Sequence, residues 1–443
     1  MKKLLLSVVF GLALALPCFA AQLSEKNPET LANVRIVGKT NKPFLSYKPG
    51  EEMVFTFTLD TGKDLPGNWN FHYRRGGDDN NTYTGKAPVN QPLVVKTSLN
   101  RAGFVYVEVT LHDANGKRIY SETVLPNKAR RKNTIIFAAG AAVEPESLKD
   151  CGEPADFDAF WAKQLKRLAA VPFAGKVEKK LVKQQRGVDV YAVSIPCVGP
   201  RPATGYLTIP QNAKAKSLPI HVIFFGYGIS KQSAPSVSSR TTINFYVNAH
   251  GQKLEQDAEY YKEFFKSIGG KAYAYNQETN KDPEACFFNG MALRDLRAVE
   301  YAKSLPEWNG KDLIIHGSSQ GGLQSMWVAA LDPQVSVVNP AVTWCCDIAG
   351  TLKQNRLGAA GRIKYTPALE YYDAVFMAKR IKNAKVVITR AGMGDYTSPP
   401  SGLAICYNNL ATPDKTIKWY QGSDHNPGTW PKGSEIVTWT NKK

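Results

Sequence analysis

A serine framed by glycines carries the clearest chemical signal in the chain. Ser319 stands at the centre of a G-x-S-x-G frame, directly after a short apolar run over residues 313–315. Apolar residues recur behind the frame at helical spacing, at Leu323, Trp327, Ala330 and Leu331. A tight turn from a strand into a helix needs glycines beside the serine, because the strained backbone and the nearby helix leave no room for side chains. The pattern predicts a nucleophile elbow with Ser319 as the nucleophile and with three elbow glycines, Gly317, Gly321 and Gly322.

An elbow serine needs a base to take its proton and a carboxylate to orient that base. In the α/β-hydrolase fold these groups follow in the chain order Ser, Asp or Glu, His. Only His425 of the six histidines lies beyond Ser319, so the order assigns it as the base. Asp395 is the predicted acid, because it follows an apolar run over residues 386–389 through a glycine-bearing turn, and catalytic groups gather at the carboxyl ends of strands. Asp424 is the alternative acid, although a neighbour of His425 in sequence would point away from its ring in most loop geometries.

Two backbone amides are candidates for an oxyanion hole. The N–H after the nucleophile belongs to Gln320, and a second donor normally follows an earlier strand. Residues 220–225 are predicted to form a buried strand that ends in a Gly-Tyr-Gly turn, which makes the amide of Tyr227 the second candidate. The alternative is that this segment is an ordinary turn between a strand and a helix.

These motifs together resemble the acetyl xylan esterase and cephalosporin C deacetylase group, carbohydrate esterase family 7. The resemblance rests on residues 317–322, 392–401, 372–375, 378–381, 156–161 and 297–300, and it runs over roughly residues 150 to 430. It implies an α/β-hydrolase fold and the deacetylation of small O-acetylated sugars by Ser319, Asp395 and His425. It also implies that no metal ion and no organic cofactor takes part.

Two segments depart from the pattern of that family. Residues 229–235 lack the usual Arg-Gly-Gln-Gly-type segment, and Asp424-His425-Asn426 stands where the family has Gly-His-Glu. The departures concern pocket shape, substrate range and the ring-like homo-oligomer of the family more than the reaction type. The acetylated carbohydrate that serves as substrate and the oligomeric state therefore stay open.

Three functions are compatible with these residues. The leading one is a serine esterase that removes acetyl groups from O-acetylated carbohydrates such as acetylated xylo-oligosaccharides. The first alternative is a broad carboxylesterase or serine peptidase, because the fold alone does not choose the acyl group. The second is a carbohydrate-binding or surface protein with a dead hydrolase domain, against which the intact order of Ser, Asp and His argues.

The first residues predict export. Residues 1–20 read as a signal peptide, with a basic start, an apolar run over residues 4–16 and small residues before a cleavage site after Ala20. A lipid anchor at Cys18 is disfavoured, because Pro17 fits poorly immediately before a lipidated cysteine. No later stretch is apolar enough to span a bilayer. We therefore expect a periplasmic or extracellular protein without stable membrane insertion.

The chain divides by pattern into two domains. Apolar residues alternate over residues 53–59 and 105–111, which predicts an all-β, immunoglobulin-like sandwich over residues 22–127. A basic link is expected at 128–148, and the α/β-hydrolase domain at 149–443, with a mostly parallel sheet and helices on both faces. Six aromatic side chains of the first domain could form a sugar platform, but packing is the favoured role: Trp69, Phe71, Tyr73, Tyr83, Phe104 and Tyr106.

The charge and the cysteines indicate which partners and which thiol chemistry to expect. The net charge of +18 is spread over both domains, and no nucleic-acid-binding motif accompanies it, so nucleic acid is not an expected partner. Loose association with anionic cell-surface polymers or uronate-bearing xylan is compatible with this charge. The six cysteines that remain after cleavage show no metal-binding spacing, and buried free thiols are expected.

Overall fold

The computed structural model describes residues 34–61, 68–124, 130–237, 239–357, 363–426 and 433–440. The expected signal peptide at residues 1–20 lies outside these ranges. Within them, no helix combines the length and the apolar character that a bilayer crossing requires. The six cysteines of the described residues are free thiols: Cys197, Cys286 and Cys406 are buried, and Cys151, Cys345 and Cys346 are half-buried.

The N-terminal part of the chain forms two antiparallel sheets around one core. One sheet has the order β1-β2-β5, with β1 at Arg35–Thr40, β2 at Met53–Asp60 and β5 at Leu93–Thr97. The other has the order β4-β3-β6-β9, with β4 at Tyr83–Pro88, β3 at Asn70–Gly77, β6 at Gly103–His112 and β9 at Ile136–Val143. Alternate residues of β2, Phe55 and Phe57, meet Val105 and Val107 of β6 in this core. The period of two seen in the sequence therefore marks the inward faces.

The segment expected as a link at 128–148 holds two strands instead. β8 at Arg130–Thr134 pairs with β7 at Tyr120–Val124, and β9 pairs with β6 along its whole length. Nearly every residue of β9 is buried, so it shows no alternation of apolar and polar side chains. A strand covered on both faces gives no period-two signal, which is why the sequence pattern did not reveal it.

The C-terminal part is built on one ten-stranded sheet. Its order is β10-β11-β12-β14-β13-β15-β16-β17-β18-β19, and the strands from β14 to β18 are parallel. The strands are β10 at Glu178–Gln185, β11 at Val188–Ile195, β12 at Ala203–Pro210, β13 at Leu218–Phe224, β14 at Ile243–Asn248, β15 at Trp308–Ser318, β16 at Val337–Ala341, β17 at Lys385–Gly392, β18 at Lys415–Tyr420 and β19 at Ile436–Thr440. The antiparallel strands lie at the two edges.

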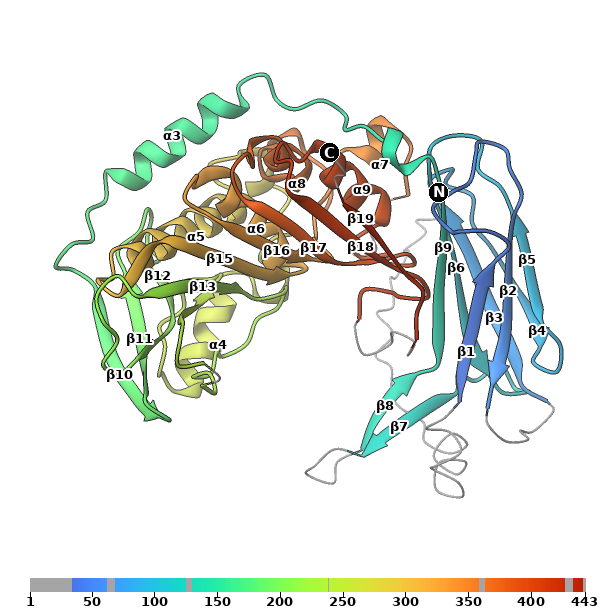
Figure 1. Cartoon of the computed structure of the whole chain (residues 1–443), viewed down its shortest axis with the longest axis horizontal. Helices are drawn as coiled ribbons and strands as arrows, with labels where there is room; N and C mark the ends of the chain where they lie inside the picture. The colour runs from blue at the N-terminus through green and yellow to red at the C-terminus, as the bar shows by residue number, and fades with distance from the viewer. Residues whose placement is uncertain are drawn as a thin grey trace, which may run out of the picture.

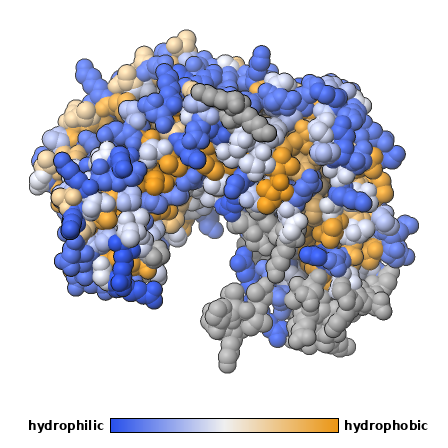
Figure 2. Space-filling model, in the orientation of Figure 1, coloured by the Kyte–Doolittle hydropathy of each residue, from blue (hydrophilic) through white to orange (hydrophobic). Residues whose placement is uncertain are grey.

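Helices precede and connect the strands of this sheet. They are α3 at Phe157–Ala169, α4 at Ala258–Ser267, α5 at Phe287–Lys303, α6 at Gln320–Leu331, α7 at Gly350–Lys353, α8 at Ala374–Met377 and α9 at Pro400–Asn409. In Figure 1, α5 and α6 lie above the sheet and α4 lies below it. Figure 2 shows the whole molecule as an arch with a hollow between its two sides.

The two parts of the chain share a packed interface, formed mainly by β6 and β9, which face the C-terminal sheet in Figure 1. Phe104 of β6 packs on Trp419 of β18, and Tyr106 packs edge-on against Tyr396, with ring centroids 5.5 and 4.9 Å apart. Of the six N-terminal aromatic residues for which packing was favoured over a sugar platform, Trp69, Phe71, Phe104 and Tyr106 are buried. Tyr73 is half-buried, and Tyr83 is exposed.

Candidate active site

The turn between β15 and α6 has the geometry of a nucleophile elbow. Ser319 separates the last residue of the strand from the first of the helix, and its φ of 59° lies in a region that non-glycine residues rarely adopt. A Cβ atom on Gly317 would overlap the carbonyl oxygen of Gly321, and one on Gly321 would overlap that of Phe224. A Cβ on Gly322 would lie 2.9 Å from the hydroxyl of Thr343. The glycines of the motif are therefore required by close backbone contacts.

Three side chains that are far apart in sequence meet at this turn. The Nε2 atom of His425 lies 3.0 Å from the Oγ atom of Ser319, and its Nδ1 atom lies 2.9 Å from Oδ2 of Asp395. The loops after β17 and β18 carry the acid and the histidine, so both groups sit at the carboxyl ends of parallel strands. Asp424 instead accepts a hydrogen bond from the backbone N–H of Asn426, at 2.8 Å. The structure thus brings Asp395, rather than Asp424, to the ring of His425.

The Asp395 carboxyl is buried and held on its other oxygen. Oδ1 accepts hydrogen bonds from the backbone N–H groups of Thr397 and Ser398, both at 2.8 Å. Burial raises the pKa of Asp395, while the hydrogen bond and charge of His425 and these two N–H groups act in the opposite direction. The His425 side chain keeps 27% of its surface exposed, whereas Asp395 is fully covered. A buried acid, a partly exposed imidazole and a serine hydroxyl in this order can activate the hydroxyl as a nucleophile.

The two oxyanion candidates both lie beside the serine. Gln320 is the first residue of α6, where backbone N–H groups point away from the helix. The turn before Tyr227 also approaches the serine, since a Cβ atom on Gly226 would lie 3.8 Å from the Cβ of Ser319. Amides from these two places are suited to stabilise a negative charge on a substrate oxygen.

A buried polar chain, which the sequence did not reveal, holds the side chain of Gln320. The hydroxyl of Tyr273 donates to Oε1 of Gln320. The Nε2 atom of Gln320 lies 3.4 Å from Oε1 of Gln324. Gln324 in turn donates to both carboxyl oxygens of Asp295, at 2.9 and 3.0 Å. These residues come from a loop and two helices, so no local spacing links them.

Aromatic rings form a wall next to the elbow. The ring of Tyr227 stacks on Tyr273 with centroids 4.5 Å apart and meets Trp344 edge-on at 5.2 Å. The backbone N–H of Trp344 donates to the carbonyl oxygen of Ser319, at 3.1 Å. Tyr273 and Trp344 are buried and Tyr227 is half-buried, so the wall can exclude water and offers apolar surface to a substrate through Tyr227.

The N-terminal part of the chain holds the loops of the acid and the histidine. The side chain of Gln421 donates from Nε2 to the carbonyl oxygen of Gly140 in β9, at 2.8 Å. Its Oε1 accepts from the N–H of Gly140 at 2.9 Å and from that of Gly422 at 3.0 Å. A Cβ atom on Gly140 would overlap the carbonyl oxygen of Met393, so strand and loop are in direct backbone contact. No sequence pattern predicted this clamp, because its partners lie 281 residues apart.

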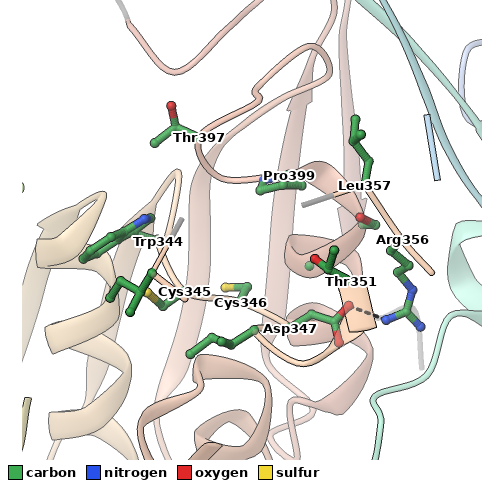
Figure 3. A pocket seen from close by; sticks show the side chains of 13 residues that line it. Trp344, Cys345, Cys346, Asp347, Thr351, Arg356, Leu357, Thr397 and Pro399 are labelled. Carbon is green, nitrogen blue, oxygen red and sulfur yellow. Dashed lines mark hydrogen bonds and ion pairs between the residues drawn. The ribbon is translucent and has the colours of Figure 1, made fainter. Parts of the chain in front are cut away.

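A small cavity of about 50 Å³ lies next to the loop that carries Asp395 (Figure 3). Trp344 and Thr397 line it at one end in Figure 3, and an ion pair between Asp347 and Arg356 lines it at the other. Burial raises the pKa of Asp347 to about 6, although Arg356 opposes that rise. Since neither Ser319 nor His425 is among its lining residues, the cavity adjoins the elbow without containing it.

A metal centre was not predicted from the sequence. In the part of the chain that the structure describes, no group of three or more His, Cys, Asp or Glu side chains is arranged to hold a metal ion.

Comparisons with known proteins agree on one family. The acetyl xylan esterase (AXE1) family pattern matches residues 147–357 and 362–443. The acetyl esterase Axe7A of Xylanibacter ruminicola is 31% identical over 292 residues, which cover 62% of this chain and 64% of the length of that relative.

Solved structures show the same fold. An acetyl xylan esterase from Paenibacillus sp. R4 superimposes on this chain with a TM-score of 0.53 at 21% identity. The superposition covers 64% of this chain and 93% of the Paenibacillus chain. Acetyl xylan esterase 1 from Thermoanaerobacterium sp. JW/SL YS485 has the same score and identity and covers 66% and 94%. The resemblance seen in the sequence is confirmed: the chain belongs to the acetyl xylan esterase family, whose members are carboxylic ester hydrolases.

Proposed function

We propose that this protein is an exported serine esterase that removes acetyl groups from O-acetylated carbohydrates. The observation that carries the proposal is the hydrogen-bonded chain from Asp395 through His425 to Ser319, on an elbow of the required geometry in a member of this family. Export rests on residues 1–20 of the sequence alone.

The first half of the reaction forms an acetyl-enzyme. The Oγ atom of Ser319 attacks the acetyl carbonyl carbon while Nε2 of His425 takes the hydroxyl proton. Asp395 keeps the imidazole in the tautomer that can accept this proton and stabilises the imidazolium. The amides of Gln320 and Tyr227 stabilise the oxyanion. The bond between the carbonyl carbon and the sugar oxygen then breaks, and His425 returns the proton to that oxygen.

Water completes the second half. His425 takes a proton from a water molecule, and the resulting hydroxide attacks the acetyl carbon. The bond to Ser319 then breaks as His425 gives its proton to Oγ, which releases acetic acid, and this ionises to acetate in water. The half-buried ring of Tyr227, which packs on Tyr273 and Trp344, suits a sugar ring, because sugars stack well on aromatic surface.

Two assays test the proposal together. An organophosphonate should label Ser319 in the wild-type protein, as seen by mass spectrometry of the intact chain, and should leave Ser319→Ala unlabelled. Acetate release from acetylated xylo-oligosaccharides should exceed the cleavage of long-chain esters and of dipeptidyl amides. Faster cleavage of either of those classes would replace the acetyl-sugar proposal with a broad esterase or a peptidase. Absent labelling together with absent turnover would leave a binding protein.

A further inference from the structure

A groove of about 550 Å³ lies on the outward face of the N-terminal strands β4, β3 and β6. Most of the side chains that line it are charged or polar, and six of them carry the argument below: Arg74, Lys86, Arg118, Glu108, His72 and His112. The groove belongs to neither the elbow nor the small cavity beside it.

The groove continues the face of β6 that packs against the candidate active site. On this face, Tyr106 contacts Tyr396, the residue after Asp395, and Glu108 follows two residues further along the strand. Arg74 pairs with Glu108 across the sheet, and its guanidinium lies 5.5 Å from the ring centroid of Tyr396. The face changes from apolar to polar where it leaves the interface, so the groove begins beside the loop of the acid.

Charges on both sides act on Glu108 in the groove. Burial raises the pKa of Glu108, and the negative charge of Asp424 adds to that rise, while Arg118 and Arg74 oppose it. A chain-like substrate whose acetyl group reaches Ser319 would extend over this surface.

The groove is cationic. Arg74, Lys86 and Arg118 line it, and within the described residues none of them forms an ion pair with a carboxylate. The carboxylate that lines the groove, Glu108, is half-buried and lies opposite Arg74 in the sheet. Lys86 and Arg118, which form no ion pair among the described residues, attract an anion, and an arginine can bind a carboxylate with two hydrogen bonds.

Hydrogen-bonding groups lie between these cations. The rings of His72 and His112 stack with centroids 3.8 Å apart, and Nε2 of His112 lies 3.0 Å from the hydroxyl of Thr110. Burial, His112 and the cations Lys86 and Arg118 lower the pKa of His72. Both ring nitrogens of His112 have protein partners, since Nδ1 lies 3.0 Å from the carbonyl oxygen of Gly116. The ring of His72 next to these cations fits a ligand that carries both hydroxyl groups and a negative charge.

We propose that this groove binds a uronic acid unit of the substrate, so that the enzyme prefers acetylated oligosaccharides that carry a carboxylate. The inference rests on the proposed function and names the substrate class of that same site. Arg118 and Lys86 bind the carboxylate, and the imidazole of His72 binds a sugar hydroxyl.

The test compares two substrates that differ only in charge. One is an acetylated xylo-oligosaccharide with a single glucuronic acid unit, and the other is the same oligosaccharide with that carboxyl group reduced to an alcohol. At low salt the wild-type kcat/KM for acetate release should be about tenfold higher for the charged substrate, and the ratio should approach one in roughly 0.5 M NaCl. Arg118→Gln and Lys86→Gln should each lower the ratio about threefold.

Lys180→Gln is the matched control, since it removes one exposed positive charge from β10 at the opposite edge of the molecule (Figure 1). Its ratio should equal that of the wild type. A wild-type ratio of one would overturn the inference. An equal drop in Lys180→Gln would also overturn it, because the net charge rather than the groove would then explain the preference.

Binding and turnover separate this inference from the proposed function. The unacetylated forms of both oligosaccharides should bind the wild-type protein with the same preference in titration calorimetry, which needs no catalysis. If acetate is released from both substrates at equal rates, only the groove inference fails. If no acetate ester is cleaved at all, the proposed function fails, and equal binding of the two unacetylated oligosaccharides then overturns the groove as well.

Discussion

Replacing Gln421 by alanine should lower turnover although its side chain contacts neither the serine nor the histidine ring. Gln421 makes three hydrogen bonds, two to the backbone of Gly140 in β9 and one to the N–H of Gly422. Around this clamp, the N–H of Gly394 donates to the carbonyl oxygen of Ser423, at 3.0 Å, so the loops of the acid and the histidine are also bonded to each other. The clamp therefore fixes both loops against one strand.

The size of the effect follows from what the substitution leaves behind. Gln421→Ala would leave two N–H groups and one carbonyl without this partner in a buried place, where each orphaned group costs about 1–3 kcal/mol. Water can enter the space left by the amide and bind some of these groups. We therefore expect the free energy of unfolding to fall by about 3 kcal/mol, the low end of the sum over the three groups. A shift of about 1 Å in the position of His425 can cost roughly 10²-fold in rate. We expect kcat to fall about 10- to 100-fold and KM to change little, because Gln421 does not face the substrate.

The assay separates positioning from simple loss of stability. Acetate release and the rate of phosphonate labelling of Ser319 are measured well below the melting temperature, where the variant is folded by circular dichroism. Gln164→Ala is the control, because Gln164 is another buried amide, which accepts hydrogen bonds from Asn289 at 3.1 Å and from Arg167 at 2.5 Å. Gln164 lies on α3, away from the elbow. The Gln164→Ala variant should therefore be less stable than the wild type but keep its kcat and its labelling rate.

A conservative variant sharpens the test. Gln421→Glu keeps the acceptor but places a negative oxygen against the carbonyl of Gly140, unless the carboxyl is protonated. Burial raises the pKa of such a carboxyl, so the ratio of variant to wild-type kcat should rise as the pH falls. Unchanged kcat in Gln421→Ala, or an equal loss in Gln164→Ala, would refute the positioning role.

Three further outcomes are expected. Ser319→Ala and His425→Ala should each lower kcat by about 10⁴ to 10⁶ with the folded yield retained, and near-normal deacetylation by either would remove the assignment. Asp395→Asn should cost about 10⁴ in kcat through the wrong imidazole tautomer, whereas Asp424→Asn should cost much less; the reverse ranking would make Asp424 the acid. Burial raises the pKa of Asp78 to about 6, above its unfolded value near 4, so the folded state binds the extra proton between these values and stability is lost as the pH rises through them. Asp78→Asn should therefore lose less unfolding free energy than the wild type between pH 4 and 6 in denaturant titrations, and parallel curves would contradict the shift.

The sequence located the elbow because its requirements are local. Strand, glycines, serine and helix follow within about twenty residues, and the backbone contacts of Gly317 and Gly321 leave few other solutions. The histidine was identified by elimination rather than by structure, since only one histidine follows Ser319. The roles of these residues remain predictions that the variants above test.

The contacts between the two parts of the chain had no such signal. β9 has the sequence IFAAGAAV, whose small residues allow β9 to approach the loops that carry Asp395 and His425. A Cβ atom on Gly394 would lie 2.5 Å from the Cβ of Ala138, which shows how close that approach is. The contact between β9 and these loops joins residues about 250 to 280 positions apart. The periodicity of a single segment cannot predict such a contact.

One face of β6 therefore contacts the C-terminal sheet at one end of the strand and lines the groove at the other. Near its start, β6 presents Phe104 and Tyr106 to the C-terminal sheet, and burial of these rings joins the two parts of the chain. Further along, Glu108 and its cationic neighbours face a groove instead of a partner surface. A domain attached only by a flexible link would position neither the loop clamp nor a subsite, because both need the sheet at a fixed distance from Ser319. If the Gln421 clamp and the groove act as proposed, the packed interface of β6 and β9 is the feature that lets the N-terminal part of the chain act on the selection and turnover of substrate.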